Sequence, residues 1–410
     1  MIKNIFSLIG IQGANFLIPL ITLPYLVRVL EPSGYGILAF VTAIVQYFSI
    51  LTDYGFNLSI TKKISIERNN KKKISELFWT GMCCKLILFC MGFFILVTAI
   101  SFNDKANNES IILLSAYIGV LGTAIFPMWL FQGKEKMIWI AFSNIIARFS
   151  IIPFIFVFVK QGDDVWIAAL INGISSLFSG VVSLIIVYKE KWVSFIRPTK
   201  KMIKNEFIDG WYVFISTVAV SLYTTSTTVI LGIVAGPIAV GYYVAADKIR
   251  QAIQSIISPI SQVFYPRISH LMSTDKDVAL SLIKKLLYGM TGLTFLAGLF
   301  LFFFSDSIIH LAYGQNYEPS IFILKILAWL PFIISFSNIF GVQTLLVLGY
   351  KKQFSCILIF SGTINILLLC VLAIFYQQIG AAISIFITEA LVSFLMLSAI
   401  LKVKIPLFKR

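Results

Sequence analysis

The stretch GPIAVGYYVAADKIRQAI (236–253) repeats a pattern found earlier in the same chain. Its first fourteen residues align with EPSGYGILAFVTAI (31–44) at a shift of 205 positions, which places Pro237 on Pro32 and Gly241 on Gly36. Each stretch follows one long apolar run and begins another, so both are predicted to hold the turn between two helices. The match predicts two related halves, an arrangement common in secondary transporters.

Long apolar runs recur along the whole chain. Hydrophobic residues make up 59% of the 410 residues and charged residues 12%, whereas soluble domains have about 45–50% and about 25%. A membrane-spanning helix needs roughly 20 apolar residues, and backbone groups in lipid must pair within their own segment. The sequence therefore predicts an all-α membrane protein with about twelve transmembrane helices, at residues 7–30, 36–60, 76–102, 111–132, 137–159, 165–188, 209–232, 237–262, 283–304, 321–348, 354–376 and 379–401.

The distribution of positive charge indicates the orientation. With twelve spans both termini lie on one side, and that side holds 25 of the 33 Lys and Arg residues. The opposite loops hold only Lys105 and Lys160. Positively charged loops stay in the cytoplasm, so both termini are expected there. The net charge of +15 is then a topology signal, and no nucleic-acid partner is expected for basic runs such as NNKKK (69–73).

The predicted domains are two lobes of six helices each. Residues 1–188 are expected to form an N-terminal lobe, 189–208 a basic cytoplasmic linker, and 209–410 a C-terminal lobe. Six is an even number, so both halves enter the membrane from the same side and form a parallel repeat. Pro19 and Pro24 remove backbone hydrogen bonds from the first span, which makes them the candidate hinge.

Three charges of the opening stretch fall inside a predicted span. An ionisable group at the bilayer centre costs about 2.5–3.5 kcal/mol, so three of them are too costly to face lipid. Asp247 and Arg250 are three residues apart, share a helix face and can pair, whereas Lys248 points away from that face. Two interpretations stay open: an ion pair that packs helices together, or a charged wall of a water-filled cavity.

Five further charges within predicted spans bear on the cavity. Arg148 is near the middle of its span and is assigned to the cavity, and Arg28 either lines the cavity or extends to the outer interface. Lys85 is expected to reach the inner interface through its long side chain. Asp53 is expected to pair with a cation or carry a proton, and Glu389 is the candidate for a lone protonatable acid, because isolation in a buried site raises a carboxyl pKa.

The sum of the embedded charges favours an anionic cargo. A cationic pocket of low dielectric attracts anions, and guanidinium groups match the geometry of phosphate. The candidate cations outnumber the candidate acids: Arg28, Arg148, Lys248 and Arg250 against Asp53, Asp247 and Glu389.

Motifs for catalysis and for nucleotide hydrolysis are absent. The chain has no HExxH, no P-loop and no GxSxG sequence. We therefore expect no enzyme activity, no metal and no cofactor. Active transport would draw on a gradient of a coupling ion, H+ or Na+, or on the gradient of the cargo itself.

Several stretches resemble one known family. FLIPLITLPYLVRVLEPSGYGILAF (16–40), DYGFNLSITKKIS (53–65), WLFQGKEKM (129–137) and FYPRIS (264–269) are similar to bacterial O-antigen transporters. These are the Wzx-type lipid-linked oligosaccharide flippases, in the polysaccharide transporter branch of the multidrug/oligosaccharidyl-lipid/polysaccharide superfamily. The resemblance runs over nearly the whole chain.

The resemblance implies a flippase of lipopolysaccharide biosynthesis in the bacterial inner membrane. It would translocate undecaprenyl-diphosphate-linked O-antigen repeat units from the cytoplasmic to the periplasmic leaflet, through a cationic cavity between two lobes that form an alternating V. Arg28 falls where such flippases tend to carry a cavity cation, so the resemblance implies a diphosphate contact there. Membrane lipids are expected partners, and an O-antigen polymerase and a chain-length regulator are candidates.

Two alternatives stay open, of which only the second belongs to a different functional class. An ion-coupled multidrug exporter of the same superfamily would handle organic cations, for which an acidic cavity would fit better. A membrane O-antigen polymerase or ligase would need a large outer loop with catalytic side chains, and the longest predicted outer loop, 305–320, is small.

Overall fold

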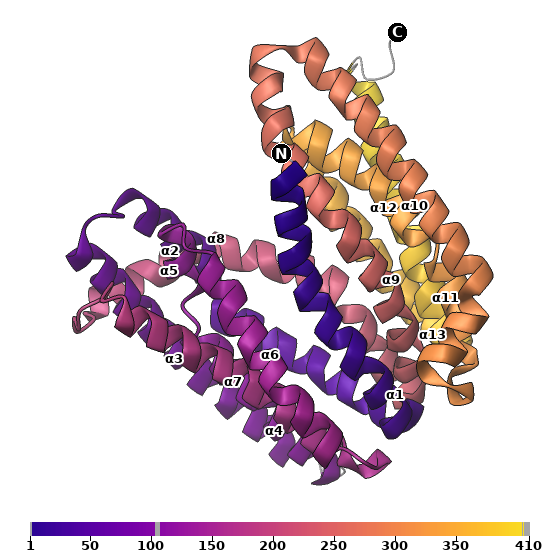
Figure 1. Cartoon of the computed structure of the whole chain (residues 1–410), viewed down its shortest axis with the longest axis horizontal. Coiled ribbons are helices and arrows are strands. Elements are labelled where there is room, and N and C mark those ends of the chain that lie inside the picture. Colours follow the sequence, from indigo (N-terminus) through magenta and orange to yellow (C-terminus); the bar gives the residue numbers. More distant parts are fainter. Residues whose placement is uncertain (1, 103–106, 404, 406–410) are drawn as a thin grey trace. The chain divides into compact units, whose positions relative to one another are not determined.

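The chain folds into helices, as its computed structural model shows (Figure 1). The structure describes residues 2–102, 107–403 and 405, without the side chains of residues 2–21, 107–109 and scattered positions between 216 and 273. In this part of the chain there is no strand, and nine helices are long and apolar enough to cross a membrane. The predicted all-α membrane class is therefore confirmed.

The helices follow one another with short connections. The α-helices are α1 (Ile2–Asp53), α2 (Phe56–Ile66), α3 (Lys71–Ser101), α4 (Asn107–Ile125), α5 (Met128–Gly133), α6 (Ile138–Phe158), α7 (Val165–Lys189), α8 (Lys200–Thr224), α9 (Ser226–Thr274), α10 (Lys276–Tyr313), α11 (Pro319–Leu327), α12 (Leu330–Ser337) and α13 (Lys351–Lys402). Two short 3-10 helices, η1 (Gly162–Asp164) and η2 (Gln315–Tyr317), and one π-helix, η3 (Asn338–Leu346), complete the described part.

Three of the longest helices contain a break that separates two predicted spans. The backbone angles φ and ψ are 56° and 175° at Glu31, 84° and 175° at Gly236, and 46° and −124° at Gln377. The predicted boundaries between these pairs of spans are confirmed. The predicted seventh span, 209–232, is instead divided at Thr225 between α8 and α9. The sequence there is rich in Thr and Ser, residue types that disfavour helix interiors because their hydroxyls can compete for backbone hydrogen bonds.

The predicted internal match has a direct structural counterpart. The breaks at Glu31 and Gly236 are the first residues of the two aligned stretches, and their backbone angles are similar. A Cβ atom on Gly36 would overlap the carbonyl oxygen of Pro237, and one on Gly241 would overlap the carbonyl oxygen of Pro32. Each proline therefore packs on the glycine of the other stretch, the reciprocal pattern that a local two-fold axis produces.

Contacts divide the chain into two compact units. Unit 1 comprises residues 1–36 and 226–410, and unit 2 comprises residues 37–225. The predicted lobes, residues 1–188 and 209–410, are groups of helices that are each expected to move as one body during transport. They stay a prediction. Helix α8 begins at Lys200, within the segment predicted as a linker, because the Thr199 hydroxyl accepts a hydrogen bond from the Met202 amide (3.3 Å) and caps the helix.

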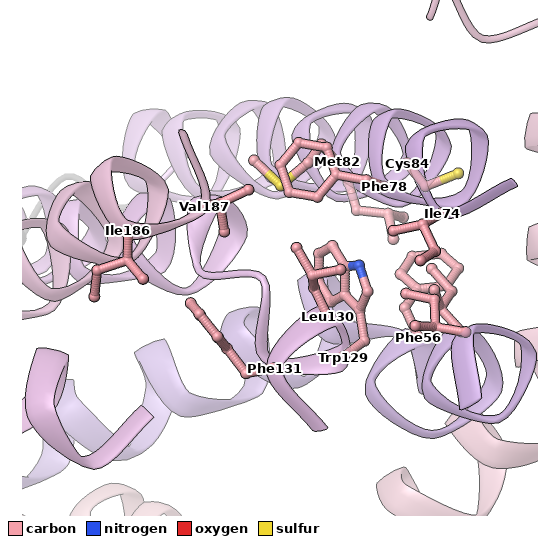
Figure 2. Close-up of a cluster of buried hydrophobic side chains, with 13 residues drawn as sticks. Phe56, Ile74, Phe78, Met82, Cys84, Trp129, Leu130, Phe131, Ile186 and Val187 are labelled. Atoms are coloured by element: carbon pink, nitrogen blue, oxygen red, sulfur yellow. The ribbon is translucent and has the colours of Figure 1, made fainter. Parts of the chain in front are cut away.

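Each unit has its own apolar core. In unit 2, side chains of α2, α3, α5 and the end of α7 pack together, with Trp129, Leu130 and Phe131 of α5 fully buried (Figure 2). The core of unit 1 joins α9, α10, η3 and α13, and includes Ile268 and Met396. These cores hold fixed the helices that carry the embedded charges.

Candidate functional site

The charged stretch of α9 is held in place by the corner that follows α10. The Tyr313 hydroxyl, at the end of α10, donates a hydrogen bond to the Ala245 carbonyl (3.2 Å). The Ser320 hydroxyl, at the start of α11, donates to the Tyr242 carbonyl (2.9 Å). Ala245 and Ala246 are fully buried. The backbone that carries Asp247, and the side chains next to it, are therefore fixed.

Asp247 and Arg250 form an ion pair within α9. The Arg250 Nε atom lies 2.6 Å from Asp247 Oδ1, and the Gln251 amide donates to Asp247 Oδ2 at 2.6 Å. The two charged side chains are 14% and 11% exposed. The predicted shared face is confirmed, and the charge of Arg250 is largely balanced by that of Asp247.

Lys248 differs from its two charged neighbours. It is exposed, and within the described part of the chain no hydrogen bond or ion pair holds its amine. An unbalanced ammonium group on a membrane-spanning helix requires water or an anion, since lipid would penalise it strongly. Lys248 is therefore the candidate anion-binding group of α9.

Glu389 is not the lone acid that the sequence suggested. It is half-buried on α13, has an interaction partner, and lies near enough to Arg250 for its charge to act on the guanidinium. The interpretation of an isolated protonatable group is wrong because α13, which carries Glu389, packs against α9, which carries Arg250. A role of Glu389 in ion coupling stays a prediction.

Arg28 caps the end of α10. Its Nε atom donates to the Ala312 carbonyl (3.0 Å) and its Nη2 atom donates to the Leu311 carbonyl. The last carbonyls of a helix lack intrahelical partners and carry its negative dipole end, so they stabilise a cation there. Carbonyl oxygens carry no formal charge, so they do not neutralise the positive charge of the Arg28 guanidinium. The Arg28 side chain is also exposed. Its contact with a diphosphate stays a prediction.

The same turn of α10 binds both Arg28 and α9. Ala312 accepts from Arg28, and the adjacent Tyr313 donates to Ala245. Unit 1 therefore brings the first span and the charged stretch to one corner. The candidate hinge prolines lie earlier in α1: Pro24 is half-buried, the side chain of Pro19 lies outside the described residues, and the backbone break falls at Glu31.

Unit 2 carries a second embedded ion pair. The Lys85 Nζ atom lies 2.5 Å from Asp53 Oδ1, donates to the Thr123 carbonyl (3.1 Å), and sits 4.6 Å from the centre of the Trp129 ring. The Lys85 side chain is 1% exposed. The expected reach of Lys85 to the inner interface is therefore wrong, because carboxylate, carbonyl and ring together replace its hydration.

Arg148 lies on α6 of unit 2. It is half-buried and has an interaction partner. The structure thus pairs Asp247 with Arg250 and Asp53 with Lys85. Arg28 belongs to neither pair and lies at the C-terminal end of α10. The assignment of Arg148, Lys248 and Arg250 to one substrate site stays a prediction.

The Asp53–Lys85 pair is expected to stabilise unit 2. Replacing Lys85 with Met leaves a carboxylate without its cation and should lower the free energy of unfolding by about 2 kcal/mol, less than for a fully buried pair because Asp53 is 31% exposed. The double variant D53N/K85M should recover part of this loss. Thermal unfolding of the purified variants measures both effects, with K62M on the exposed face of α2 as control. Equal losses in K85M and the double variant would contradict the pairing.

Sequence reasoning missed three sets of side-chain interactions that the structure shows. Gln251 lies four residues after Asp247, a spacing that predicts contact on a helix, and could have been found. The cap formed by Arg28 joins positions 284 residues apart, and no local pattern indicates it. A third group, Lys63 with Glu206 (2.6 Å) and Asp209 (2.7 Å), joins α2 to α8.

Comparisons with known proteins agree with this fold. The family described as "Polysaccharide biosynthesis protein" matches residues 1–272. The chain is 38% identical over 398 residues to the "Putative O-antigen transporter" of Escherichia coli (strain K12), covering 96% of this chain and 95% of that protein. It is 31% identical over 402 residues to the protein of the same name from Shigella dysenteriae, covering 98% and 100%. The solved structure "Lipid II flippase MurJ, inward closed conformation" has a TM-score of 0.74 at 14% identity, covering 96% of this chain and 87% of that one.

Proposed function

Because the chain belongs to the polysaccharide biosynthesis protein family, we propose that it is a lipid-linked oligosaccharide flippase. The proposed cargo is an undecaprenyl-diphosphate-linked O-antigen repeat unit. The proposed direction is from the cytoplasmic to the periplasmic leaflet of the bacterial inner membrane, with both termini in the cytoplasm. The names of the two relatives support the cargo class, and their coverage of nearly the whole chain supports a transporter rather than an enzyme.

One observation of this structure carries the proposal: the exposed Lys248 ammonium beside a balanced ion pair. Asp247 and Arg250 offset each other (2.6 Å), so Lys248 adds a net positive charge to a membrane-spanning surface. Arg28 adds a second, held by carbonyl groups alone in the contacts described. A diphosphate headgroup supplies the negative charge that two such cations would bind.

The headgroup and the lipid tail have different requirements during translocation. Diphosphate and sugars must leave the lipid phase, and a cation attracts a phosphate more strongly in a medium of low dielectric than in water. The polyprenyl tail is apolar and can stay in the bilayer. We propose that the protein exposes Lys248 and Arg28 alternately to the two leaflets, and that Arg250 orients the segment through its pair with Asp247.

The coupling ion is proposed to be H+ or Na+. Asp53, Asp247 and Glu389 are the embedded acids that could respond to it, and two of them are paired with cations. An O-antigen polymerase and a chain-length regulator are proposed partners, because they would act on the translocated unit.

A multidrug exporter remains the second candidate function, and the embedded charges distinguish it. An exporter of organic cations would be served by exposed acids, but Asp53 and Asp247 are balanced by Lys85 and Arg250, and Glu389 is half-buried and near Arg250. The observed pairing thus favours an anionic cargo.

A deletion strain tests the function. Without this protein, lipid-linked repeat units should accumulate in the cytoplasmic leaflet, out of reach of a lectin added to spheroplasts, and surface O-antigen should disappear. The wild-type chain should restore both. Repeat units that reach the outer leaflet normally without the protein would refute the proposal, whereas accumulation of assembled but unligated polymer outside would indicate a ligase instead.

A further inference from the structure

Unit 2 has a groove beside α8 that neither the embedded charges nor the proposed cargo explains. Its volume is about 620 Å³. Helix α8 contributes most of its lining, and Ile87 of α3 and Tyr54 complete it. Apolar and aromatic side chains make up all of the lining except two lysines, Lys200 and Lys204.

The lysines and the apolar residues follow one another along a single face of α8. Lys200, Lys204, Phe207 and Trp211 are spaced by three or four residues, so they form a stripe. The lysines lie in the first two turns of the helix, and Trp211 lies about three turns beyond Lys200. The groove is therefore basic at one end and apolar along the rest of its length.

The side of α8 turned away from the lysines binds α2, and Phe207 of the groove face also packs into unit 2, with its ring centre 5.1 Å from that of Tyr54. Glu206 and Asp209 both bind Lys63 of α2 (2.6 and 2.7 Å). A Cβ atom on Gly210 would lie 2.9 Å from the Tyr54 carbonyl oxygen, so this face lies close against the preceding turn. Unit 2 covers the groove face only in part, since Ile208 and Trp211 on it are 57% and 47% exposed.

The length of the stripe is similar to the thickness of one leaflet of a bilayer. At about 1.5 Å per residue, Lys200 and Trp211 are about 16 Å apart along the helix axis. The hydrocarbon core of a bilayer is about 30 Å thick, so each leaflet contributes about half of this. An acyl chain that began at the lysines would reach the depth of Trp211.

We propose that this groove binds one anionic phospholipid of the cytoplasmic leaflet. The phosphate lies against Lys200 and Lys204, where the positive end of the α8 dipole adds to their charge, and one acyl chain follows Ile87, Phe207 and Trp211. The excess of Lys and Arg on this side of the chain agrees with a surface rich in anionic lipids. The far longer polyprenyl tail of the proposed cargo does not match a groove of one leaflet's depth. Bound lipid would hold α8 against α3.

Thermal stability in the presence of defined lipids tests the site. Phosphatidylglycerol added to the purified protein in neutral detergent should raise its Tm more than phosphatidylcholine does. The variant K200A/K204A should bind phosphatidylglycerol about 30-fold more weakly, as expected for two lysines near an anionic surface. The control K351A/K352A removes two exposed lysines from the start of another helix, α13, and should bind as wild type does.

A second variant keeps the lysines and fills the groove. I87W places an indole ring at the groove wall and should also abolish the effect of phosphatidylglycerol. I95W is its control, since Ile95 lies on the same helix, is 45% exposed like Ile87 (46%), and does not line the groove. Equal stabilisation by both lipids, or unchanged phosphatidylglycerol binding in both groove variants, would overturn the proposal. Stabilisation by undecaprenyl diphosphate but not by phosphatidylglycerol would overturn it in favour of the carrier lipid.

Discussion

Replacing Gly36 with alanine is expected to destabilise unit 1 by about 3 kcal/mol, at the upper end of the effect of overpacking. The added Cβ would overlap the Pro237 carbonyl oxygen and lie 2.6 Å from its carbon and 2.9 Å from the Gly241 amide nitrogen. All three atoms belong to the backbone, so no side chain can rotate to make room. The two helical stretches must separate, and every contact around the Glu31 and Gly236 breaks is affected.

Thermal unfolding in detergent measures this loss, which should appear as a fall in Tm of roughly 5 °C or more. The reciprocal variant G241A meets the Pro32 carbonyl and should behave in the same way. G289A is the matched control, because nothing lies within 4 Å of the position of its added Cβ. Unchanged stability in both G36A and G241A would show that the Pro–Gly seam is not tightly packed.

Replacing Lys248 with alanine is expected to abolish most transport and leave the fold intact. Loss of one charged hydrogen-bond donor to phosphate weakens binding by about 1.5–3 kcal/mol, or roughly 10- to 100-fold. Lys248 is exposed and holds no partner among the described residues, so its removal leaves no group unpaired. Surface O-antigen in a complemented deletion strain reports activity, and Tm reports stability.

Arg250 provides the contrast to Lys248. R250A leaves Asp247, only 14% exposed, without its cation, and should therefore lower Tm as well as transport. K248R keeps the charge and should retain part of the activity, while K351A/K352A should have full activity. Normal O-antigen in K248A, or an equal loss of Tm in K248A and R250A, would contradict the separate roles of these two residues.

The fold was largely predictable because the bilayer restricts the secondary structure that a membrane-spanning segment can form. Twenty-residue apolar runs can only form helices there, and the joints at 233–236 and 377–378 do contain the breaks at Gly236 and Gln377. The alignment at a shift of 205 also located the Glu31 and Gly236 breaks. It could not predict that the prolines and glycines of the two stretches contact each other, since that depends on how α1 and α9 pack.

The contacts of the charged residues were predictable only where both partners lie close together in the sequence, on the same helix. Asp247 and Arg250 pair at a spacing of three, as expected for a helix. The partners of Lys85 and Arg28 lie on other helices, and those of Arg28 are backbone carbonyls, which any residue possesses. Glu389 seemed isolated because its own span contains no other charge, although α13 packs on α9.

Translocation by the purified protein tests the central claim most directly. Vesicles containing the protein and a labelled undecaprenyl-diphosphate-linked O-unit are treated with a membrane-impermeant reagent that destroys the label. We predict that wild-type vesicles lose the label from both leaflets, whereas vesicles with K248A lose only the outer-leaflet label, as protein-free vesicles do. Protection of the inner-leaflet label in wild-type vesicles, under an imposed H+ or Na+ gradient as well as without one, would contradict the account.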